Sequence, residues 1–464
     1  MTYLLLSLAA ILVCFIAVLV ARAAAFKPKN NVKVQENEEV FDRDVVISRL
    51  AELVKCKTIS YGDKSLEDNA EFDKLIALLP KLYPNVFKTC EYKELPDRAL
   101  LFCWKGKTEG DPAVLMAHYD VVPVNEDMWD KPPFEAVLED GVLSAAEHLI
   151  ETGFTPESDI YFAFSGGEEV NGKGALNIVN YFEEKGINPA MVVDEGGAVV
   201  ENVFPGVKAP CGLIGIAEKG MMNVEYSTKT AGGHASAPKP HTPVGILSKA
   251  CCRVEAHPFK HHITPPVAKL FDTLGRHSSF VFKIVFSNIW LFKGLIDNFL
   301  CIKKGGEINA LMRTTVAFTQ MEGSKAPNVI PPRAAMVSNM RLNPMDNIDS
   351  AMAYLKKVVN DDNVEIKLLG GMNPSRISTT DCEGYDKVAT AVASTWKGCI
   401  VSPYLMVQCS DSRHWGKISD KVYRFSAMDL TSEERATIHG NNERIRVDCA
   451  CRAVEFYIRL IKQC

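Results

Sequence analysis

Four places in this sequence carry side chains that bind metal ions or move protons. The first is an H-x-D pair, the second is a pair of adjacent glutamates, and a single aspartate and a distant histidine follow. The residues are His118, Asp120, Glu168, Glu169, Asp194 and His439. Imidazole nitrogens and carboxylate oxygens make a mixed ligand set that suits zinc, as one ion or as two ions bridged by water. The pattern therefore predicts metal-dependent hydrolysis if the fold gathers these residues.

The H-x-D pair stands at the end of an apolar run, residues 113–117, which predicts a short buried strand. Side chains two residues apart on an extended chain face the same way, so Asp120 can orient the His118 ring. Taken alone, this pair fits a structural histidine at a strand end better than a metal ligand. The other acidic residues decide between these interpretations.

Glu168 and Glu169 lie in a glycine-flanked loop. Two adjacent carboxylates repel each other unless a cation or a proton separates them. In one arrangement of metal hydrolases, one acid binds the metal and the other accepts a proton from the attacking water. A solvated acidic loop is the alternative. Residues 167–174 do not form a phosphate-binding loop, because the final Ser or Thr is missing and two carboxylates would repel phosphate.

Three apolar segments separated by helical patterns each end in acids or histidine. They are residues 113–117, 160–164 and 191–193. This pattern predicts an α/β fold with a doubly wound sheet and its charged groups at one edge. From about residue 220, mixed strands and helices predict a smaller α+β lid or dimerisation domain inserted into the first. We expect the catalytic domain at 42–218 and 369–464, and the insertion at 219–368.

The N-terminus predicts a segment that meets a membrane. Residues 3–20 are apolar apart from Ser7, and Arg22 is the first charge, so the run is about long enough to span a bilayer. Residues 21–25 resemble a cleavage site, so residues 1–25 fit either a signal peptide or a membrane anchor. Both place the chain in the secretory pathway, secreted or membrane-anchored. Residues 26–41 are expected to form a polar stalk.

A second apolar stretch, residues 280–300, contains Lys283, Lys293 and Asp297, which argue against a second membrane span. The net charge of −5 gives no electrostatic case for a nucleic-acid partner. The fourteen cysteines show no paired C-x-x-C spacing, and most lie in apolar surroundings. They predict buried free thiols, with room for one or two disulfides.

Eight motifs together resemble the di-zinc metallopeptidase and amidohydrolase family of carboxypeptidase S, aminoacylase and the secreted N-acyl-amino-acid hydrolases. In chain order they are M-A-H-Y-D-V-V-P, W-D-K-P-P-F, F-S-G-G-E-E-V-N-G-K-G-A, V-V-D-E-G-G, G-G-H-A-S-A-P, N-V-I-P-P, S-D-S-R-H-W and I-H-G-N-N-E-R-I. The resemblance covers nearly everything after about residue 42.

The resemblance implies two zinc ions per subunit. His118 and Asp194 would bind one ion, and Glu169 and His439 would bind the other. Asp120 would orient His118. These roles come from the family pattern, because the spacing alone does not divide the ligands between two metals.

The resemblance also implies the residues that act on the substrate. Glu168 would be the general base. His234 would stabilise the developing oxyanion, which in this family often happens across a homodimer. Asn328 and Arg341 would hold the substrate's carbonyl and carboxylate, since a planar guanidinium matches a carboxylate bidentately. A surface ion pair is the alternative for Arg341.

One element of the family pattern is missing. Members normally follow W-x-x-P-P-F with a segment resembling D-G-x-x-Y-G-R-G-x-x-D-x-K, whose Asp bridges the two metals. Here Glu139, Asp140, Gly141 and Val142 run directly into Leu143, which resembles the second half of the next helix. The gap is roughly 20 residues by typical element lengths. No other Asp stands in an equivalent context, so the sequence offers no bridging metal ligand.

The missing segment lowers the expected capacity of the site. Each zinc would keep two protein ligands where catalytic zinc usually has three plus water, so full occupancy is not expected. The missing strand should also leave sheet edges unpaired or out of register. A clean junction inside a helix indicates the omission of a block, through alternative splicing or a faulty gene model, rather than gradual drift.

The resemblance thus implies a zinc-dependent hydrolase that cleaves an amide next to a free carboxylate. The substrate would be a small peptide, cut at its C-terminal peptide bond, or an N-acyl amino acid. We expect this version to be impaired or inactive. The alternative from another class is an inactive family member that binds ligands or dimerises through the inserted domain.

Overall fold

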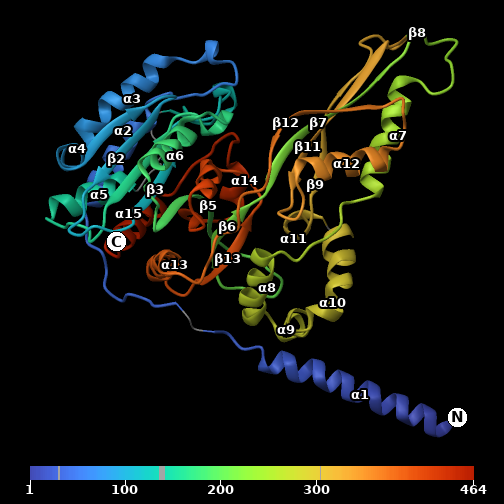
Figure 1. Ribbon diagram of the computed structural model, residues 1–464, viewed down its shortest axis with the longest axis horizontal. Coiled ribbons are helices and arrows are strands. Elements are labelled where there is room, and N and C mark those ends of the chain that lie inside the picture. The colour runs from blue at the N-terminus through green and yellow to red at the C-terminus, as the bar shows by residue number, and fades with distance from the viewer. Residues whose placement is uncertain (30–31, 135–141, 304) are drawn as a thin grey trace.

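The computed structural model describes residues 1–29, 32–134, 142–303 and 305–464. The part of the junction prediction that concerns Glu139, Asp140 and Gly141 lies outside these residues. The described chain forms a large mixed sheet with helices on both faces, a smaller sheet with two helices, and a projecting N-terminal helix (Figure 1). The prediction of an α/β catalytic fold with a smaller lid is confirmed.

The large sheet has eight strands in the order β1-β2-β4-β3-β5-β14-β6-β13. Their bounds are β1 (Glu91–Leu95), β2 (Ala99–Trp104), β3 (Ala113–His118), β4 (Ile160–Ser165), β5 (Met191–Val200), β6 (Cys211–Glu218), β13 (Ile400–Met406) and β14 (Val422–Leu430). β3 runs parallel to β4 and β5, and β5 runs parallel to β14. The carboxyl ends of β3 and β4 therefore meet at one edge, where parallel sheets place their ligands.

Helices cover both faces of this sheet, which explains why β2 and β4 are buried along their whole length. One face carries α2 (Arg43–Val54), α3 (Asn69–Leu82), α4 (Pro84–Thr89), α5 (Val142–Glu151), α13 (Glu383–Thr395) and α15 (Val447–Ile461). The other face carries α6 (Gly174–Lys185) and the short helix η5 (Asp411–Lys417). The sheet is therefore doubly wound, as predicted.

The expected gap in the sheet is not found in the described part of the chain. Each interior strand of the large sheet pairs on both sides. Helix α5 begins at Val142, where the described residues resume, and packs into the core through Leu143 and Leu149. Its buried Glu147 accepts hydrogen bonds from the N–H groups of Asn85 and Val86 at the start of α4. The prediction of unpaired sheet edges thus finds no support among the described interior strands, while the part of that prediction that concerns register stays a prediction.

The smaller sheet has the antiparallel order β12-β7-β11-β9, with α7 and α12 packed against it. The bounds are β7 (Gly220–Lys229), α7 (Pro243–Ala256), β9 (Thr315–Glu322), β11 (Arg333–Leu342), α12 (Ile348–Val359) and β12 (Glu365–Met372). A two-stranded ribbon of β8 (Gly233–His234) and β10 (Val329–Ile330) forms the tip of this lid, far from β3 and β5 (Figure 1).

The insertion predicted at 219–368 contains a second unit. Its helices are α8 (Pro265–His277), α9 (Phe280–Ser287), α10 (Ile289–Leu295), the π-helix η4 (Ile296–Lys303) and α11 (Gly306–Met312). Leu270 and Leu274 of α8 share a buried cluster with Leu213 of β6 and Leu405 of β13. These helices therefore pack on the catalytic sheet, so a single lid domain does not describe the whole insertion. The exact boundaries stay predictions.

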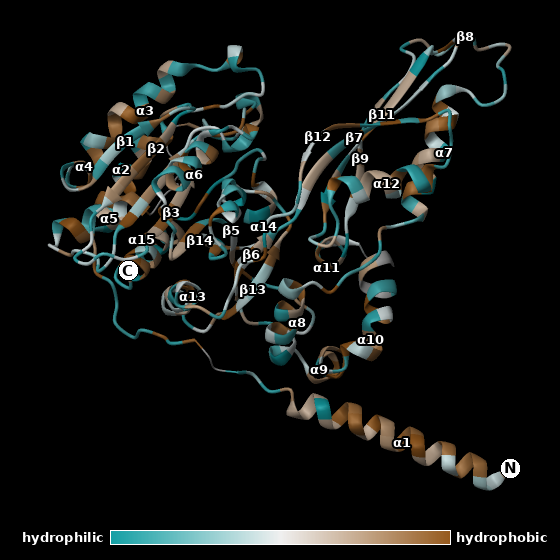
Figure 2. Ribbon diagram, viewed as in Figure 1, coloured by the Kyte–Doolittle hydropathy of each residue, from teal (hydrophilic) through white to brown (hydrophobic). Residues whose placement is uncertain are grey.

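The N-terminal helix α1 (Thr2–Ala25) is long and apolar enough to cross a membrane, by length and composition, and Figure 2 shows it as almost uniformly hydrophobic. Signal sequences pass the same criterion. All fourteen cysteines are free in the described residues, and most are buried. This matches the prediction of free thiols.

A buried ion pair ties the two halves of the catalytic domain together. Arg424 of β14 donates from Nε to Oε2 of Glu218 on β6 at 3.0 Å, and both side chains are 1% exposed. The same carboxylate accepts hydrogen bonds from the backbone N–H and the hydroxyl of Ser410. Glu218 thereby fixes the loop that leads into η5 beside the candidate site.

Replacing Arg424 with Met should leave the buried Glu218 carboxylate without its cation, with only the hydrogen bonds from Ser410. We expect a loss of about 3–5 kcal/mol in unfolding free energy, measured by urea denaturation. Arg333→Met is the matched control, because Arg333 pairs with Glu225 on the surface with 39% of its side chain exposed. That change should cost about 1 kcal/mol or less. Equal losses in the two variants would contradict the role given to the buried pair.

Candidate metal centre

Asp120 is the residue around which the centre is built. It is 1% exposed, and its carboxylate accepts hydrogen bonds from Ser60 Oγ at 2.6 Å and from the backbone N–H groups of Glu168 and Glu169 at 2.9 and 3.2 Å. His118 Nδ1 lies 2.9 Å from the Asp120 carbonyl oxygen and 3.4 Å from its carboxylate. Asp120 therefore positions the histidine and the glutamate pair at the same time.

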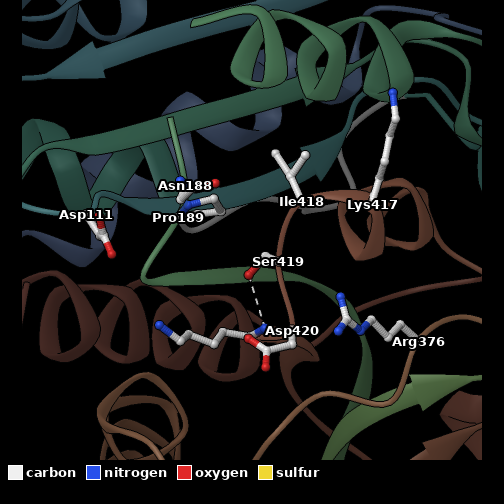
Figure 3. A pocket seen from close by; sticks show the side chains of 9 residues that line it. Asp111, Asn188, Pro189, Arg376, Lys417, Ile418, Ser419 and Asp420 are labelled. Atoms are coloured by element: carbon white, nitrogen blue, oxygen red, sulfur yellow. Dashed lines mark hydrogen bonds between the residues drawn. The ribbon is translucent and has the colours of Figure 1, made fainter. Parts of the chain in front are cut away.

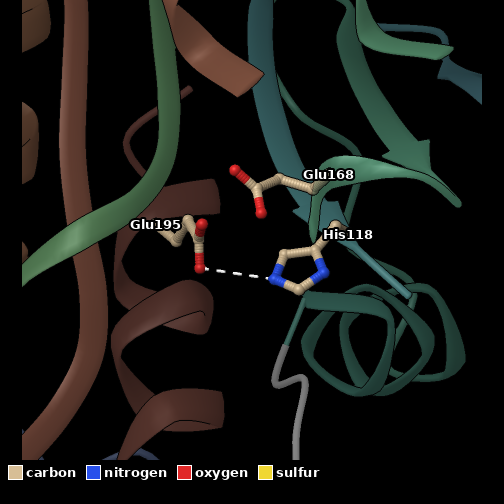
Figure 4. A group of neighbouring side chains, drawn as sticks. All are labelled: His118, Glu168 and Glu195. Atoms are coloured by element: carbon tan, nitrogen blue, oxygen red, sulfur yellow. Dashed lines mark ion pairs between the residues drawn. The ribbon is translucent and has the colours of Figure 1, made fainter. Parts of the chain in front are cut away.

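His118, Glu168 and Glu195 form the one group of three or more donors that the described part of the chain brings together. Their ligand atoms lie within 4.8 Å of one another, and His118 Nε2 is 3.5 Å from Glu195 Oε2 (Figure 4). The pairing of β3 with β5 stops at Leu115 and Val193, three residues before His118. Beyond that point Glu195 approaches the histidine.

Two glycines let β5 follow this path. A Cβ on Gly197 would lie 1.8 Å from the carbonyl oxygen of Leu213 on β6, and a Cβ on Gly196 would lie 2.5 Å from Met406 Sδ. Gly196 also has a φ of +147°, a backbone angle that residues other than glycine rarely adopt. The D-E-G-G stretch therefore combines an acid at the site with a backbone that only glycine permits.

The structure places Glu195, which the sequence analysis did not select, where Asp194 was expected. Adjacent residues of a strand face opposite sides. The Asp194 carboxylate accepts a hydrogen bond from the backbone N–H of Ser412 at 2.7 Å and is 2% exposed. The ligand role of Asp194 stays a prediction, and the geometry favours Glu195. The neighbouring acids in the sequence indicate a ligand at this position, but the sequence does not show which of the two side chains faces His118.

His439 and Glu169 form a second pair, as the sequence suggested. His439 Nε2 is 3.4 Å from Glu169 Oε1. The histidine has a φ of 59°, and its backbone N–H donates a hydrogen bond to the Glu443 carboxylate. Asn442 of the same loop exchanges hydrogen bonds with Asp130 of the W-D-K-P-P-F segment. The His439 side chain is 56% exposed and that of Glu169 is 14% exposed, so the histidine lies on the open side of the centre.

The centre accumulates negative charge. Burial and the charge of Glu195 raise the pKa of Glu168 to about 9, and burial also raises the pKa of Glu169. Burial opposes a charge on His118, but Glu195 and Asp120 outweigh it and raise the pKa of His118. A divalent cation would relieve this repulsion. The donors present therefore fit a metal ion at His118, Glu195 and Glu168.

The donor set fits a second ion less well. Glu169 and His439 remain a pair without a third donor among the described residues. Asp120 cannot serve both ions freely, because Ser60 and two backbone N–H groups occupy its oxygens. No shared carboxylate is thus found between the two pairs in the described chain.

The predicted substrate residues lie on the lid. His234 on β8 is exposed and shares a hydrogen bond with Ser236 Oγ at 2.8 Å, and Asn328 is exposed directly before β10. The structure therefore does not bring either residue to the metal donors of its own chain (Figure 1). Arg341 on β11 donates to Cys409 Sγ at 3.5 Å, at the junction between the lid and the catalytic domain.

A cavity of about 330 Å³ lies elsewhere (Figure 3). Asp111, Asn188 and Ser419 in its lining precede β3, β5 and β14. It therefore opens at the amino ends of these strands, opposite the edge that carries His118. This cavity does not belong to the candidate metal centre.

Metal affinity distinguishes the roles of the adjacent acids Asp194 and Glu195. Glu195→Ala should weaken zinc or cobalt binding more than about tenfold, measured by isothermal titration calorimetry, because it removes a donor of the three-residue group. Asp194→Asn keeps the size of a side chain that is hydrogen-bonded elsewhere, so its effect should be smaller. A large loss in Asp194→Asn together with unchanged affinity in Glu195→Ala would restore the original ligand assignment.

Comparison with known proteins extends these observations to almost the whole chain. A family model described as "Peptidase family M20/M25/M40" matches residues 114–463. A probable carboxypeptidase S-like 2 of Dictyostelium discoideum is 32% identical, with 89% of this chain and 84% of the relative covered. The N-fatty-acyl-amino acid synthase/hydrolase PM20D1 of Xenopus tropicalis is 30% identical, with 97% and 93% covered.

Two solved structures share the fold. The M20 family metallo-carboxypeptidase Sso-CP2 of Sulfolobus solfataricus has a TM-score of 0.64 at 18% identity, covering 90% of this chain and 98% of its own. Human carnosine dipeptidase 1 has a TM-score of 0.62 at 13% identity, covering 91% and 96%. These likenesses concern the fold alone. With its fold, its donor group and its sequence relatives in agreement, this chain belongs to the M20/M25/M40 peptidase family of hydrolytic enzymes.

Proposed function

We propose that this chain is built to hydrolyse an amide next to a free carboxylate with the help of zinc. The observation that carries the proposal is the meeting of His118, Glu168 and Glu195 at the carboxyl edge of the sheet. Relatives named as carboxypeptidases and as N-fatty-acyl-amino acid hydrolases support two substrate classes. These classes are small peptides cut at their C-terminal bond and N-acyl amino acids.

Glu168 is the proposed general base. Its backbone is fixed by Asp120, and its carboxylate stands beside the His118 and Glu195 donors. A bound zinc ion would supply Lewis-acid polarisation of the carbonyl and activation of a water. Glu168 would take the proton from the attacking water and pass it to the leaving amine nitrogen. Glu169 and His439 would face the same reaction space from the open side.

Substrate binding is assigned to the lid. Arg341 would pair with the substrate carboxylate, since it lies at the junction of the lid with the catalytic domain. His234 would stabilise the oxyanion and Asn328 would hold the carbonyl. Because the lid tip stands away from its own metal donors in Figure 1, we propose that a second copy of the chain supplies these two residues in a homodimer.

We further propose that the chain as written is impaired. The Glu169–His439 pair has no third donor in the described residues, and the sequence lacks the segment that supplies the bridging Asp. The same observation supports the second candidate function, a non-catalytic member that binds ligands or dimerises through its lid. Helix α1 supports a secretory-pathway location, either secreted or membrane-anchored.

Restoring the missing segment should separate these functions. We expect insertion of the family segment, roughly 20 residues, between Val142 and Leu143 to raise the hydrolysis of N-acyl amino acids or of dipeptides. The control carries the same insertion with its bridging Asp changed to Asn, and it should stay as slow as the chain as written. Absence of activity in every version, with intact folding, would favour the non-catalytic function.

Glu168→Gln tests the general base. In the restored chain, kcat should fall by about 10²–10⁴ while KM changes little, because the amide cannot accept the proton. Arg341→Lys should instead raise KM, since the planar guanidinium is lost. Steady-state kinetics distinguish the two outcomes. Full turnover in Glu168→Gln would remove Glu168 from the mechanism.

A further inference from the structure

The C-terminal part of helix α1 packs against α9, whereas the rest of the helix is exposed. Leu19 and Ala23 are buried at 8% and 1% exposure. The Arg22 guanidinium donates to the Ser287 carbonyl oxygen at 2.9 Å, at the end of α9. The amide of Asn288, which is fully buried, donates to the Leu19 carbonyl oxygen at 3.2 Å. The C-terminal part of α1 is therefore an integral part of the helical unit α8–α10.

Phe26, the residue after α1, adds to this packing. The Phe26 ring lies under the Arg276 guanidinium of α8 at 4.3 Å. A Cβ on Gly275 would meet Phe286 at 2.8 Å and Phe26 at 3.2 Å, so the glycine permits the close approach. Cleavage after Ala25 would remove Leu19 and Ala23 and uncover the α9 surface that they bury. The packing favours retention of α1.

The exposed length of α1 needs an apolar environment. Only 6% of its most apolar window is buried, and side chains such as Ile11, Leu12 and Val13 are more than half exposed. A 24-residue helix is about 36 Å long, against roughly 30 Å for the hydrocarbon core of a bilayer. A bilayer is the partner that matches this length and composition.

Helices α9 and α10 continue the same apolar surface. Their exposed large side chains are Phe280, Val281, Trp290, Leu291 and Leu295, at 51%, 70%, 55%, 41% and 48%. The Trp290 ring contacts Phe15 of α1 edge-on, with centroids 6.4 Å apart. This surface is thus joined directly to the exposed apolar length of α1.

The contact with Phe15 sets a depth for Trp290. Phe15 precedes Arg22, the first charge, by seven residues, which is at most about 10 Å along the bilayer normal. Interfacial helices bury their apolar faces by about 5–10 Å. Lys293 is exposed one helical turn after Trp290, and its long side chain can reach the headgroup level, as can that of Arg22 on α1. Depth and charge placement therefore agree.

We propose that α1 is retained as a membrane anchor and that α9 and α10 lie in the surface layer of the same bilayer. The catalytic domain is then held against the membrane by two attachments, a spanning helix and an interfacial helix pair. The partner is the phospholipid bilayer itself. This proposal stands apart from the catalytic one, because neither attachment uses a residue of the metal centre.

Trp290 provides the test. The full chain is reconstituted into phosphatidylcholine vesicles and into vesicles whose acyl chains carry bromine, which quenches tryptophan fluorescence on contact. We expect quenching of the full chain and loss of most of that quenching in Trp290→Phe. Trp104, Trp396 and Trp415 are buried in the catalytic domain and should contribute little. Trp129→Phe is the matched control and should keep the quenching unchanged.

Two results would overturn the proposal. The first is equal quenching in the full chain and in Trp290→Phe, which would leave α10 outside the bilayer. The second is an N-terminus after Ala25 in protein extracted from membranes, found by intact-mass measurement, which would mean that α1 is cleaved. Retention of α1 together with Trp290-dependent quenching supports both attachments.

Discussion

The buried carboxylate of Asp120 is the constraint on which the centre depends. It accepts hydrogen bonds from Ser60 and from the backbone of both glutamates, and it lies against His118. One side chain therefore joins the end of β3 to the loop after β4. The H-x-D spacing is required because the histidine and its orienting acid must leave the same side of the strand end.

This arrangement concentrates acids around His118. Glu168 and Glu195 lie close to His118. Burial and the charge of Glu195 together raise the pKa of Glu168. A metal ion converts that repulsion into binding energy. The same electrostatics underlie the proposed impairment, because two cations held close without a shared carboxylate would repel each other.

Much of the fold followed from periodicity. The three apolar segments ending in acids or histidine became β3, β4 and β5, and their common edge became the candidate site. Three features did not follow. Whether Asp194 or Glu195 faces His118 depends on strand register, which alternates at every residue. The helices α8–α11 joined the catalytic sheet through tertiary packing that no local pattern reveals.

The third feature that did not follow from the sequence is the pairing of the large sheet near the junction. A family pattern predicted an unpaired edge after the junction, yet α5 closes onto the core and Glu147 meets the start of α4. Local packing can be completed without the missing segment, whereas a metal bridge needs one particular carboxylate. The large sheet is therefore continuous in the described residues, and the proposed impairment concerns the metal bridge alone. We thus propose that this junction lowers the activity of the chain and leaves its folding intact.

Zinc stoichiometry of the purified chain as written tests this separation most directly. Emission spectrometry after dialysis against a weak chelator counts the ions that stay bound. Fewer than two tightly bound zinc ions per folded chain are expected, because Glu169 and His439 lack a third donor in the described residues. Two tightly held zinc ions in the chain as written would contradict the proposed impairment.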